Sequence, residues 1–382
     1  MKRVILLGSS GSIGQSACKV ARELPERMKI VGLAVNGSVS VLLEQAREFG
    51  VKALAVYDGK AAADAERELA TVSGTRLFKG AAGLVELVRE TEADMVLVAI
   101  VGTAGLAPAL AALESGKDLA VASKEILVMA GESVMKTAAD RGRAILPVDS
   151  EHNAIFQCLR GAADREVRRL ILTASGGPFR RTPREQLVNV SVEQALQHPT
   201  WNMGKKITID SATLFNKGLE MIEARWLFNV EMARIDVIVH PQSIVHSMVE
   251  FVDHSVLAQL SHSDMCFPIQ YAVTYPDRLP NRLGSLDFAK IAQLTFEAPD
   301  PARFPALTLA RHAGTVGGTM PAVFNAANEV AVARFLARRG TFPQIWESVE
   351  KVMARHQSVA SADLDAILKA DAWARAACAR LD

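Results

Sequence analysis

The 382-residue sequence has only four cysteines, and its charges nearly cancel. Cys18, Cys158, Cys266 and Cys378 form no C-x-x-C pair and no Cys/His spacing typical of a metal site, so four buried, inert thiols are expected. A net charge of +1 lacks the basic excess of proteins that bind nucleic acids or membrane surfaces. We therefore expect a small-molecule partner and no role for a nucleic acid or a membrane.

Long apolar runs are also missing. Only four apolar residues follow Met1-Lys2-Arg3 before Gly8, which is too short for the core of a signal peptide. No later run approaches the ~20 residues that span a bilayer. These features predict a cytoplasmic protein. Since 382 residues exceed what one hydrophobic core usually supports, we expect two or three domains.

The N-terminal part alternates short apolar runs with helical patterns, which predicts a doubly wound, Rossmann-like parallel sheet. The predicted strands are residues 4–7, 29–35, 53–56, 95–101, 119–122 and 144–148. Gly8, Gly11 and Gly14 follow the first strand, where backbone N–H groups can approach a pyrophosphate at a helix N-terminus. The second strand ends in Asn36-Gly37-Ser38, without the acid of an NAD site. This disfavours NAD and permits NADP, although no Arg or Lys stands there to meet a 2′-phosphate.

Charged groups follow two of the later strands, in Ser123-Lys124-Glu125 and Asp149-Ser150-Glu151-His152-Asn153. Asp149 and Glu151 are two apart on a chain leaving a strand, so they point the same way, and a cation or a shared proton would relieve their repulsion. Alternatively, these acids only cap the helix that runs through Ile155.

Further strand-like runs follow between residues 170 and 260. A buried strand at 170–174 ends in Ser175-Gly176-Gly177, which suits either an anion-binding nest or an ordinary tight turn. Strand-like runs at 237–239, 244–251 and 256–260 predict an antiparallel sheet. Because these strands alternate too little to leave one face in water, we predict cover by a second copy in a homodimer, with helices of the same chain as the alternative.

The C-terminal part predicts a small helical bundle. Residues 276–304 are rich in Pro, Asp and Arg, which is typical of a linker. Helical apolar spacing follows at 321–339, 342–356 and 361–381, with Ser361 and Asp363 as start signals.

Residues 198–220 form the central stretch of the chain. A Pro-Trp-Gly loop leads to a predicted strand at 206–209 and then to a helix that carries Asn216, Lys217 and Glu220. Asn216 and Glu220 are four apart and project from one face with Lys217 beside them, so this face could hold both an anion and a cation. The alternative is an amphipathic helix with a solvated stripe, capped by Asp210 or Ser211.

Together, the motifs of this chain resemble those of the 1-deoxy-D-xylulose 5-phosphate reductoisomerase family over nearly its full length. The motifs are G-S-S-G-S-I-G at 8–14, A-I-V-G at 99–102, S-K-E at 123–125, D-S-E-H-N at 149–153, S-G-G-P-F at 175–179, H-P-T-W-N-M-G-K-K-I-T-I-D-S-A-T at 198–213, N-K-G-L-E at 216–220, H-P-Q-S at 240–243 and N-A-A-N-E-V-A at 325–331. The resemblance implies an enzyme of isoprenoid precursor synthesis that uses NADPH and Mg²⁺ or Mn²⁺ and forms homodimers. It also implies an NADPH-binding domain at 1–149, a catalytic α+β domain at 150–275 with a lid loop at 197–206, a linker at 276–304 and a helical domain at 305–382.

The resemblance further implies a role for each matching residue. Asp149, Glu151 and Glu220 would bind the metal, and Lys124, Glu151 and His152 would be catalytic. The substrate, a phosphorylated keto sugar, would contact Lys124, Ser150, Glu151, Ser175, His198, Trp201, Ser211, Asn216, Lys217 and Glu220, with its phosphate on Ser175, Ser211, Asn216 and Lys217 and with Trp201 on the lid. NADPH would contact Gly8, Ser10, Gly11, Ser12, Ile13, Gly14, Gly37, Ser38, Ser123, Glu125, Gly204 and Met265.

Two positions differ from the family pattern. Ser123 replaces a common Asn, and Asn36-Gly37-Ser38 replaces a Gly-basic-Asn sequence. Both positions lie on the cofactor side and bear on the preference for NADPH over NADH.

The residue types suit the implied reaction. Three carboxylates form a hard oxygen site that favours Mg²⁺ or Mn²⁺ over zinc, and such an ion polarises a substrate carbonyl. One alternative is an NADP-dependent phosphosugar dehydrogenase without rearrangement, which needs no metal. Another is a phosphosugar-sensing module, which would bind its ligands without turnover.

Overall fold

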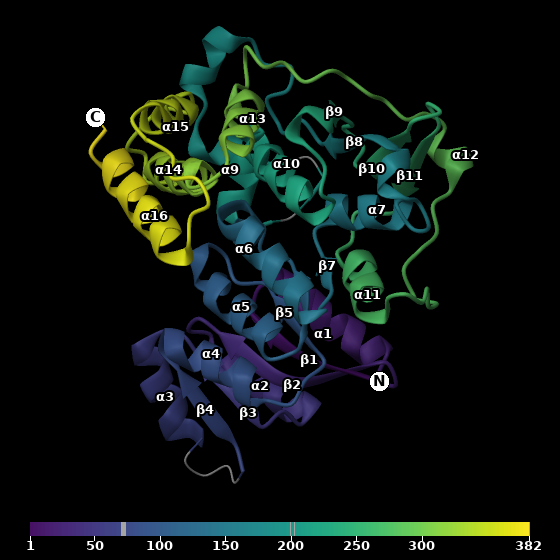
Figure 1. Cartoon of the computed structure of the whole chain (residues 1–382), viewed down its shortest axis with the longest axis vertical. Coiled ribbons are helices and arrows are strands. Elements are labelled where there is room, and N and C mark those ends of the chain that lie inside the picture. The colour runs from purple at the N-terminus through teal and green to yellow at the C-terminus, as the bar shows by residue number, and fades with distance from the viewer. Residues whose placement is uncertain (70–73, 199, 202, 382) are drawn as a thin grey trace. The chain divides into compact units, whose positions relative to one another are not determined.

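The computed structural model describes residues 1–69, 74–198, 200–201 and 203–381. The chain divides into two compact units, whose elements are labelled in Figure 1. Unit 1 comprises Met1–Ile126, Val134–Asn153 and Asp264–Leu283, and unit 2 comprises Leu127–Ser133, Ala154–Ser263 and Gly284–Asp382. The division into three domains and a linker stays a prediction.

Unit 1 contains a seven-stranded sheet in which all neighbouring strands are parallel. In spatial order, the strands are β4 (Arg76–Lys79), β3 (Ala53–Val56), β2 (Met28–Val35), β1 (Lys2–Leu7), β5 (Met95–Val98), β6 (Asp118–Val121) and β7 (Ile145–Pro147). The strand order reverses between β1 and β5, which is the point where such sheets bind ligands. The predicted parallel sheet is confirmed. Its edge strand β4 has no predicted counterpart, because R-L-F-K has only two apolar residues.

Among the described residues, five helices connect these strands and pack against the sheet (Figure 1). They are α1 (Ser12–Glu23), α2 (Val39–Phe49), α3 (Gly59–Leu69), α4 (Gly80–Glu90) and α5 (Leu106–Glu114). Helices α6 (Glu125–Arg141) and α7 (Ser150–Cys158) follow β6 and β7 and belong in part to unit 2, whereas α11 (Cys266–Thr274) belongs to unit 1. Helix α11 comes from a distant part of the sequence and packs on α1, where the Cys266 thiol lies 3.8 Å from the carbonyl oxygen of Ser16.

Unit 2 contains a four-stranded sheet in the order β11 (Val256–Leu260), β10 (Val245–Phe251), β8 (Val167–Ala174) and β9 (Ile235–Val239). Strand β10 is antiparallel to both of its neighbours, but β8 and β9 are parallel. The antiparallel sheet predicted for 237–239, 244–251 and 256–260 is therefore confirmed for β10 and β11 but wrong for β9, which pairs in parallel with β8 and does not neighbour β10. The reason is the long helical segment between β8 and β9, which supplies the crossover that parallel strands need.

Helices form the rest of unit 2. They are α8 (Val192–Ala195), α9 (Lys205–Thr213), α10 (Phe215–Leu227), α12 (Phe288–Ile291), α13 (Ala306–Val316), α14 (Met320–Leu336), α15 (Gln344–Ala354) and α16 (Leu364–Ala379). Helix α14 contacts α13, α15 and α16, which confirms the predicted helical bundle (Figure 1). Asp363 caps α16 by accepting a hydrogen bond from the Ala366 N–H at 2.8 Å, as predicted. Ser361 does not cap the helix.

Residues 206–209 belong to helix α9, so the predicted strand is wrong. Their β-branched side chains favour a strand, but tertiary contacts override so weak a preference. The hydroxyl groups of Thr208 and Thr213 donate to carbonyl oxygens one helical turn earlier, at 2.9 Å each. Leu214, with φ +64°, ends α9 and begins α10, so neither Asp210 nor Ser211 caps the second helix.

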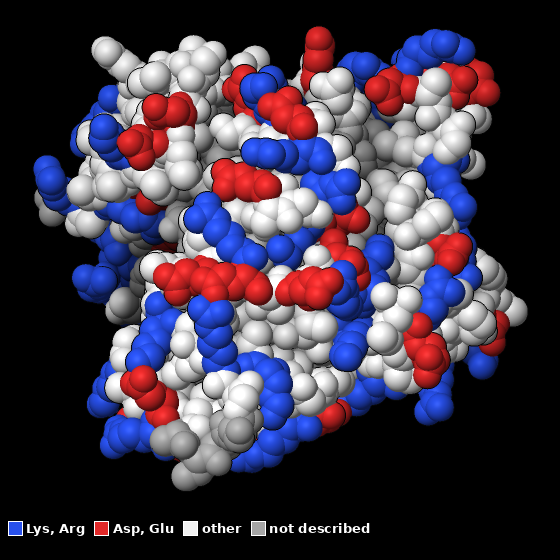
Figure 2. Space-filling view, turned by 60° about the horizontal axis from the view of Figure 1, so that its bottom comes forward, with Lys and Arg blue, Asp and Glu red and all other residues white. Residues whose placement is uncertain are grey.

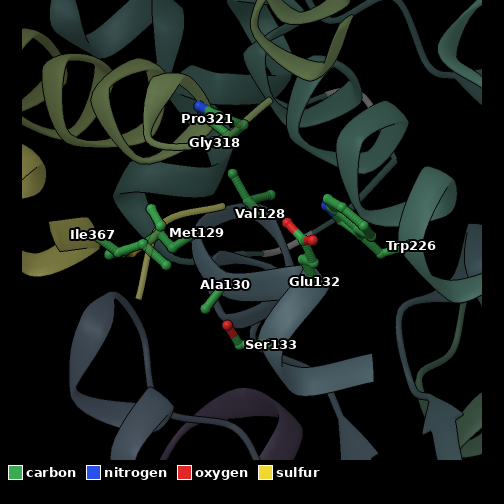
Figure 3. Close-up of a pocket in the computed structure, with 11 residues that line it drawn as sticks. Val128, Met129, Ala130, Glu132, Ser133, Trp226, Gly318, Pro321 and Ile367 are labelled. Carbon is green, nitrogen blue, oxygen red and sulfur yellow. The ribbon is translucent and has the colours of Figure 1, made fainter. Parts of the chain in front are cut away.

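A pocket in unit 2 lies beside an irregular turn of α6 (Figure 3). Ala130 departs from helical geometry, with φ −132° and ψ 27°. At the next residue, Gly131, a Cβ atom would lie 2.2 Å from Cδ1 of Trp226. The indole ring thus fills the space that a side chain would need, and only glycine fits at this position of the helix.

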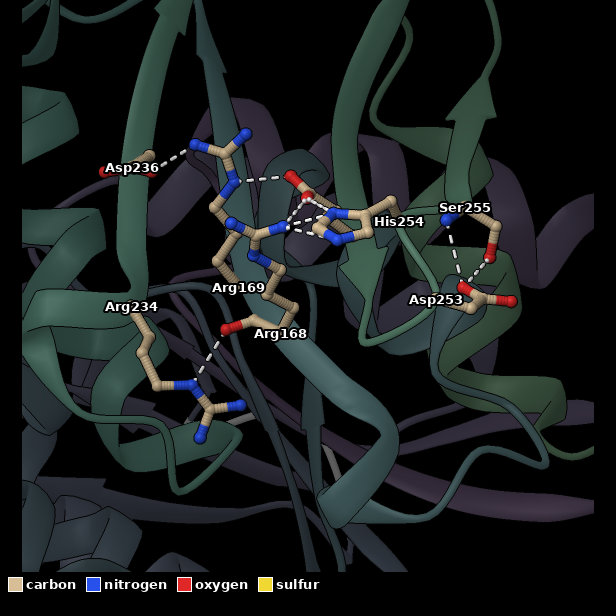
Figure 4. A network of polar contacts seen from close by, with 8 residues as sticks. Arg168, Arg169, Arg234, Asp236, Asp253, His254 and Ser255 are labelled. Carbon is tan, nitrogen blue, oxygen red and sulfur yellow. Dashed lines mark hydrogen bonds and ion pairs between the residues drawn. The ribbon is translucent and has the colours of Figure 1, made fainter.

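An ion-pair network crosses the sheet of unit 2 (Figure 4). Arg169 of β8 donates to Glu250 of β10 at 2.6 Å and to Asp236 of β9 at 2.8 Å. The hydrogen bond from Arg169, with further ones from Arg168 and His254, lowers the pKa of Glu250 to about 2. The network therefore links three neighbouring strands through charges that persist at neutral pH.

The surface carries both signs of charge. On the face shown in Figure 2, Lys and Arg side chains alternate with Asp and Glu side chains. Within the described part of the chain, no helix is both long and apolar enough to span a membrane.

All four cysteines are free and buried, as predicted. Burial raises the pKa of Cys18 to about 11 and that of Cys266 to about 12, so both stay protonated at neutral pH.

Candidate active site

The glycine loop between β1 and α1 requires glycine at two positions. Gly8 has φ +90°, and a Cβ atom there would lie 2.4 Å from the carbonyl oxygen of Ala99 on the neighbouring strand connection. A Cβ atom on Gly14 would lie 2.4 Å from the carbonyl oxygen of Gly8. The loop therefore folds tightly against the first turn of α1. Such a loop brings backbone N–H groups and a helix N-terminus close to a pyrophosphate.

Gln45 supports this loop and has no counterpart among the predicted site residues. It lies on α2, is only 4% exposed, and donates through Nε2 to the carbonyl oxygen of Ser9 at 3.0 Å. The sequence signal is a polar residue between the apolar positions Leu43 and Ala46 on the buried face of a helix.

The other predicted cofactor residues lie mostly in unit 1. Gly37 and Ser38 precede α2, and Met265 precedes α11, the helix that packs on α1. The buried hydroxyl of Ser123 donates to the carbonyl oxygen of Ile100 beyond β5, and the buried Glu125 begins α6. Gly204 lies in unit 2, at the N-terminus of α9.

Five predicted site residues of unit 1 gather at the carboxyl end of β7. Lys124 is 7% exposed, and its Nζ lies 2.9 Å from Oδ2 of Asp149. The other oxygen, Oδ1, accepts from the backbone N–H of Glu151 at 3.1 Å and lies 3.2 Å from Nδ1 of His152. Asp149 thus caps α7, as one alternative predicted, and is also ion-paired. The hydroxyl of Ser150 donates to Glu151 Oε2 at 2.5 Å.

A second cluster of predicted site residues lies in unit 2, after β8. Nδ1 of His198 accepts hydrogen bonds from the backbone N–H groups of Thr200, at 3.2 Å, and Trp201, at 3.0 Å. In the neutral ring, the proton is therefore on Nε2, which donates to Oγ of Ser175 at 3.0 Å. That oxygen also accepts from the N–H of Gly177 at 3.2 Å. With two donors on its oxygen, the Ser175 hydroxyl is directed to donate its own hydrogen to an acceptor such as a phosphate oxygen.

The same loop packs against the end of α9. Gly176 and Gly177 have φ +79° and +64°, and a Cβ atom on Gly177 would lie 2.8 Å from Cα of Ala212 and 2.9 Å from the carbonyl oxygen of Ser211. Ser175 and Ser211 are thus carried by two segments in direct backbone contact. This arrangement favours the predicted anion nest over a simple turn.

The predicted polar face of α10 is present, but it is buried. Lys217 is 3% exposed and Glu220 is 0% exposed. Both Lys217 Nζ and Asn216 Nδ2 donate to the Glu220 carboxylate, each at 2.5 Å. The solvated-stripe alternative is therefore wrong. Lys217, predicted to hold the phosphate, also neutralises the predicted metal ligand Glu220.

Trp201, on the predicted lid, is half-buried, and its loop contacts the H-P-Q-S turn, where the Thr200 hydroxyl lies 3.5 Å from that of Ser243. Residues 199 and 202 of the predicted lid loop at 197–206 lie outside the described residues. The predicted metal ligands come from both units, since Asp149 and Glu151 belong to unit 1 and Glu220 to unit 2.

Comparisons with known proteins identify the same enzyme family along nearly the whole chain. A family model described as 1-deoxy-D-xylulose 5-phosphate reductoisomerase matches residues 4–131, and models of C-terminal domains of the same enzyme match residues 145–228 and 260–377. A relative with this name from Pelotomaculum thermopropionicum is 51% identical over 98% of this chain and 97% of its own length. The solved enzyme from Zymomonas mobilis in complex with NADPH is 43% identical, covers 99% of this chain and 98% of its own, and has a TM-score of 0.92. A DOX-P reductoisomerase in complex with NADPH, fosmidomycin and magnesium is 39% identical with the same coverage and has a TM-score of 0.94.

Proposed function

The chain belongs to the 1-deoxy-D-xylulose 5-phosphate reductoisomerase family, and from this premise we propose which of its residues perform the reaction. The enzyme converts 1-deoxy-D-xylulose 5-phosphate to 2-C-methyl-D-erythritol 4-phosphate in the methylerythritol phosphate pathway, with NADPH and a divalent cation as cofactors. This assignment rests on the family models, which match three segments that together span most of the chain.

The glycine loop is proposed to bind the NADPH pyrophosphate, and NADPH supplies the hydride for reduction. The proposal is supported by the tight approach of Gly8 and Gly14 and by the contact of Gln45 with the loop backbone. Gly37 and Ser38 are proposed to face the adenosine ribose, while Ser123, Glu125, Gly204 and Met265 face the nicotinamide side. Because no Arg or Lys occupies 36–38, we expect only a moderate preference for NADPH over NADH.

Asp149, Glu151 and Glu220 are proposed to hold Mg²⁺ or Mn²⁺, which polarises the substrate carbonyl when bound. The donor set fits such an ion, because all three side chains offer carboxylate oxygens. Two of the three carboxylates have a buried lysine beside them, Lys124 for Asp149 and Lys217 for Glu220. These lysines offset part of the repulsion between the acids when no cation is bound.

Lys124 and His152 are proposed to act on protons at the reacting carbons, together with Ser150. Lys124 donates a hydrogen bond to the Asp149 carboxylate. His152 is fully buried, and its Nδ1 is within hydrogen-bond distance of the same carboxylate. This fixed geometry holds donors and acceptors in position before the substrate arrives, which general acid–base chemistry requires.

Ser175, Ser211, Asn216, Lys217 and His198 are proposed to bind the substrate phosphate. The hydroxyl of Ser175 is prepared as a donor by His198 and Gly177. Binding energy from this remote phosphate can then close the loop that carries Trp201 and exclude water from the reacting carbons. The backbone hydrogen bond from Trp201 to His198 supports a link between the loop and the phosphate site.

We also propose a homodimer that works in the cytoplasm. Strand β11 lies at the edge of the unit 2 sheet and exposes 46% of Val256 and 52% of Leu257. An apolar edge strand needs cover, and a second copy can provide it. The free thiols suit a reducing compartment. Sedimentation tests the dimer, because a mass near one 41.1 kDa chain at micromolar concentration contradicts it.

The decisive assay for the proposed roles is NADPH oxidation with 1-deoxy-D-xylulose 5-phosphate, with and without Mn²⁺, and with NADH in parallel. Turnover should stop with EDTA and return with added metal. A phosphosugar dehydrogenase would continue in EDTA, and a sensing module would bind its ligands without consuming NADPH.

A further inference from the structure

Asp210 is a buried carboxylate with partners on two helices. It lies on α9 and is only 1% exposed. Oδ1 accepts a hydrogen bond from Nδ2 of Asn328 on α14 at 2.9 Å, and Oδ2 lies 2.6 Å from Nζ of Lys206, one turn earlier on α9. A carboxylate is tolerated in the interior only when it is paired and hydrogen-bonded. The hydrogen bond from Asn328 therefore ties Asp210 to α14, while Lys206 offsets the buried charge from within α9.

The hydrogen bond from Asn328 connects α14 to α9, the helix that carries the predicted phosphate ligand Ser211. Asp210 immediately precedes Ser211, whose carbonyl oxygen is in tight contact with the loop after Ser175. Beyond Ser211, the chain turns at Leu214 and continues into α10 with Asn216 and Lys217. A displacement of Asp210 thus moves Ser211 and the surface against which the Ser175 loop packs.

We propose that Asp210 and Asn328 are positioning residues for recognition of the substrate phosphate. Through Asn328, the C-terminal helix α14 holds α9 in the place where Ser211 and the Ser175 loop meet the phosphate. This inference rests on the proposed role of Ser175 and Ser211 in phosphate binding. It gives the C-terminal helices a part in substrate affinity in addition to their packing role.

One substitution breaks the pair of Asp210 and Asn328, and exchanging the two side chains restores it. Asn328→Asp sets two carboxylates against each other, whereas the double variant Asp210→Asn/Asn328→Asp restores one amide and one carboxylate and keeps an amide oxygen at position 210 for Lys206. For the single variant, we expect the KM for 1-deoxy-D-xylulose 5-phosphate to rise roughly tenfold. A change of this size corresponds to the interaction energy that residues in contact typically share. The turnover number and NADPH affinity should change by less than about threefold, and the double variant should restore most of the KM.

Asn325→Asp is the matched control. Asn325 is as buried as Asn328 and lies one turn earlier on α14, but its Nδ2 donates to Glu329 on the same helix at 2.9 Å. This control should lower the unfolding midpoint and leave the KM unchanged. If Asn328→Asp does not fold, Asn328→Ala takes its place, because it removes the donor without adding a charge.

The outcomes separate this inference from the proposed phosphate site. If Ser175→Ala raises the KM while Asn328→Asp lowers stability only as Asn325→Asp does, the positioning role is overturned and the phosphate site stands. If the exchange restores neither KM nor stability, the positioning role also fails. If Ser175→Ala leaves the KM unchanged, the phosphate assignment itself fails.

Discussion

Replacing Gly177 with alanine tests the loop that carries Ser175. Gly177 has φ +64°, and the added Cβ would meet Cα of Ala212 at 2.8 Å and the carbonyl oxygen of Ser211 at 2.9 Å. Both contacts are with backbone atoms, which cannot rotate away as a side chain can. The substitution therefore has to push the loop and α9 apart by a few tenths of an ångström.

Two contributions set the size of the effect. A left-handed conformation costs a non-glycine residue roughly 1–2 kcal/mol. Overpacking against a fixed neighbour costs roughly a further 1–3 kcal/mol. If the second contribution is relieved by separating Ser175 from Ser211, phosphate binding is weakened by that amount, and the KM for the substrate rises about 5- to 150-fold.

Gly50→Ala provides the matched control. Gly50 has φ +66° and ψ 27° at the end of α2, and apart from its chain neighbours no described residue lies within 4 Å of its added Cβ. This variant should show the loss of stability that comes from the backbone conformation alone, with an unchanged KM. Steady-state kinetics and urea unfolding of both variants give the comparison. A folded Gly177→Ala variant with normal KM, or an equal rise of KM in Gly50→Ala, would refute the reasoning.

Three further predictions concern the metal site, the lid and the sheet. Glu220→Gln keeps the shape of the side chain but removes its charge, so turnover should fall by more than about 100-fold while NADPH binding, followed by fluorescence, stays close to normal; near wild-type turnover at limiting metal would contradict the metal assignment. Trp201→Ala should raise the KM and lower the turnover number together without changing the unfolding midpoint. A large loss of stability with normal kinetics would instead make Trp201 a core residue. The pKa of Glu250 is lowered from 4.5 to about 2, so its contribution to the free energy of unfolding is complete above about pH 4.5 and is lost as the pH falls toward 2. The difference in urea midpoint between Glu250→Gln and the wild type should therefore narrow below about pH 4.5, and a difference that widens on acidification contradicts the network.

Local patterns in the sequence are sufficient to predict the parallel sheet of unit 1, the glycine loop and the C-terminal helices. Each depends on a local pattern. Apolar runs form buried parallel strands, glycines permit the close approach at Gly8 and Gly14, and helical spacing forms the bundle around α14. The long motif at 198–220 also indicated the reductoisomerase family, because many of its residues match the family's motif in the same order.

The remaining features depend on contacts between residues that are distant in sequence, and these contacts exist only in the folded chain. The β-branched run at 206–209 is a helix, and the next residue, Asp210, accepts a hydrogen bond from Asn328, 118 positions away. Strands β8 and β9 are parallel because helices lie between them in the chain. Lys124 neutralises Asp149, 25 positions away, because β6 and β7 are neighbours and end at the same edge of their sheet. No local pattern predicts such partners, because a buried charge is stabilised by the groups that the fold brings beside it.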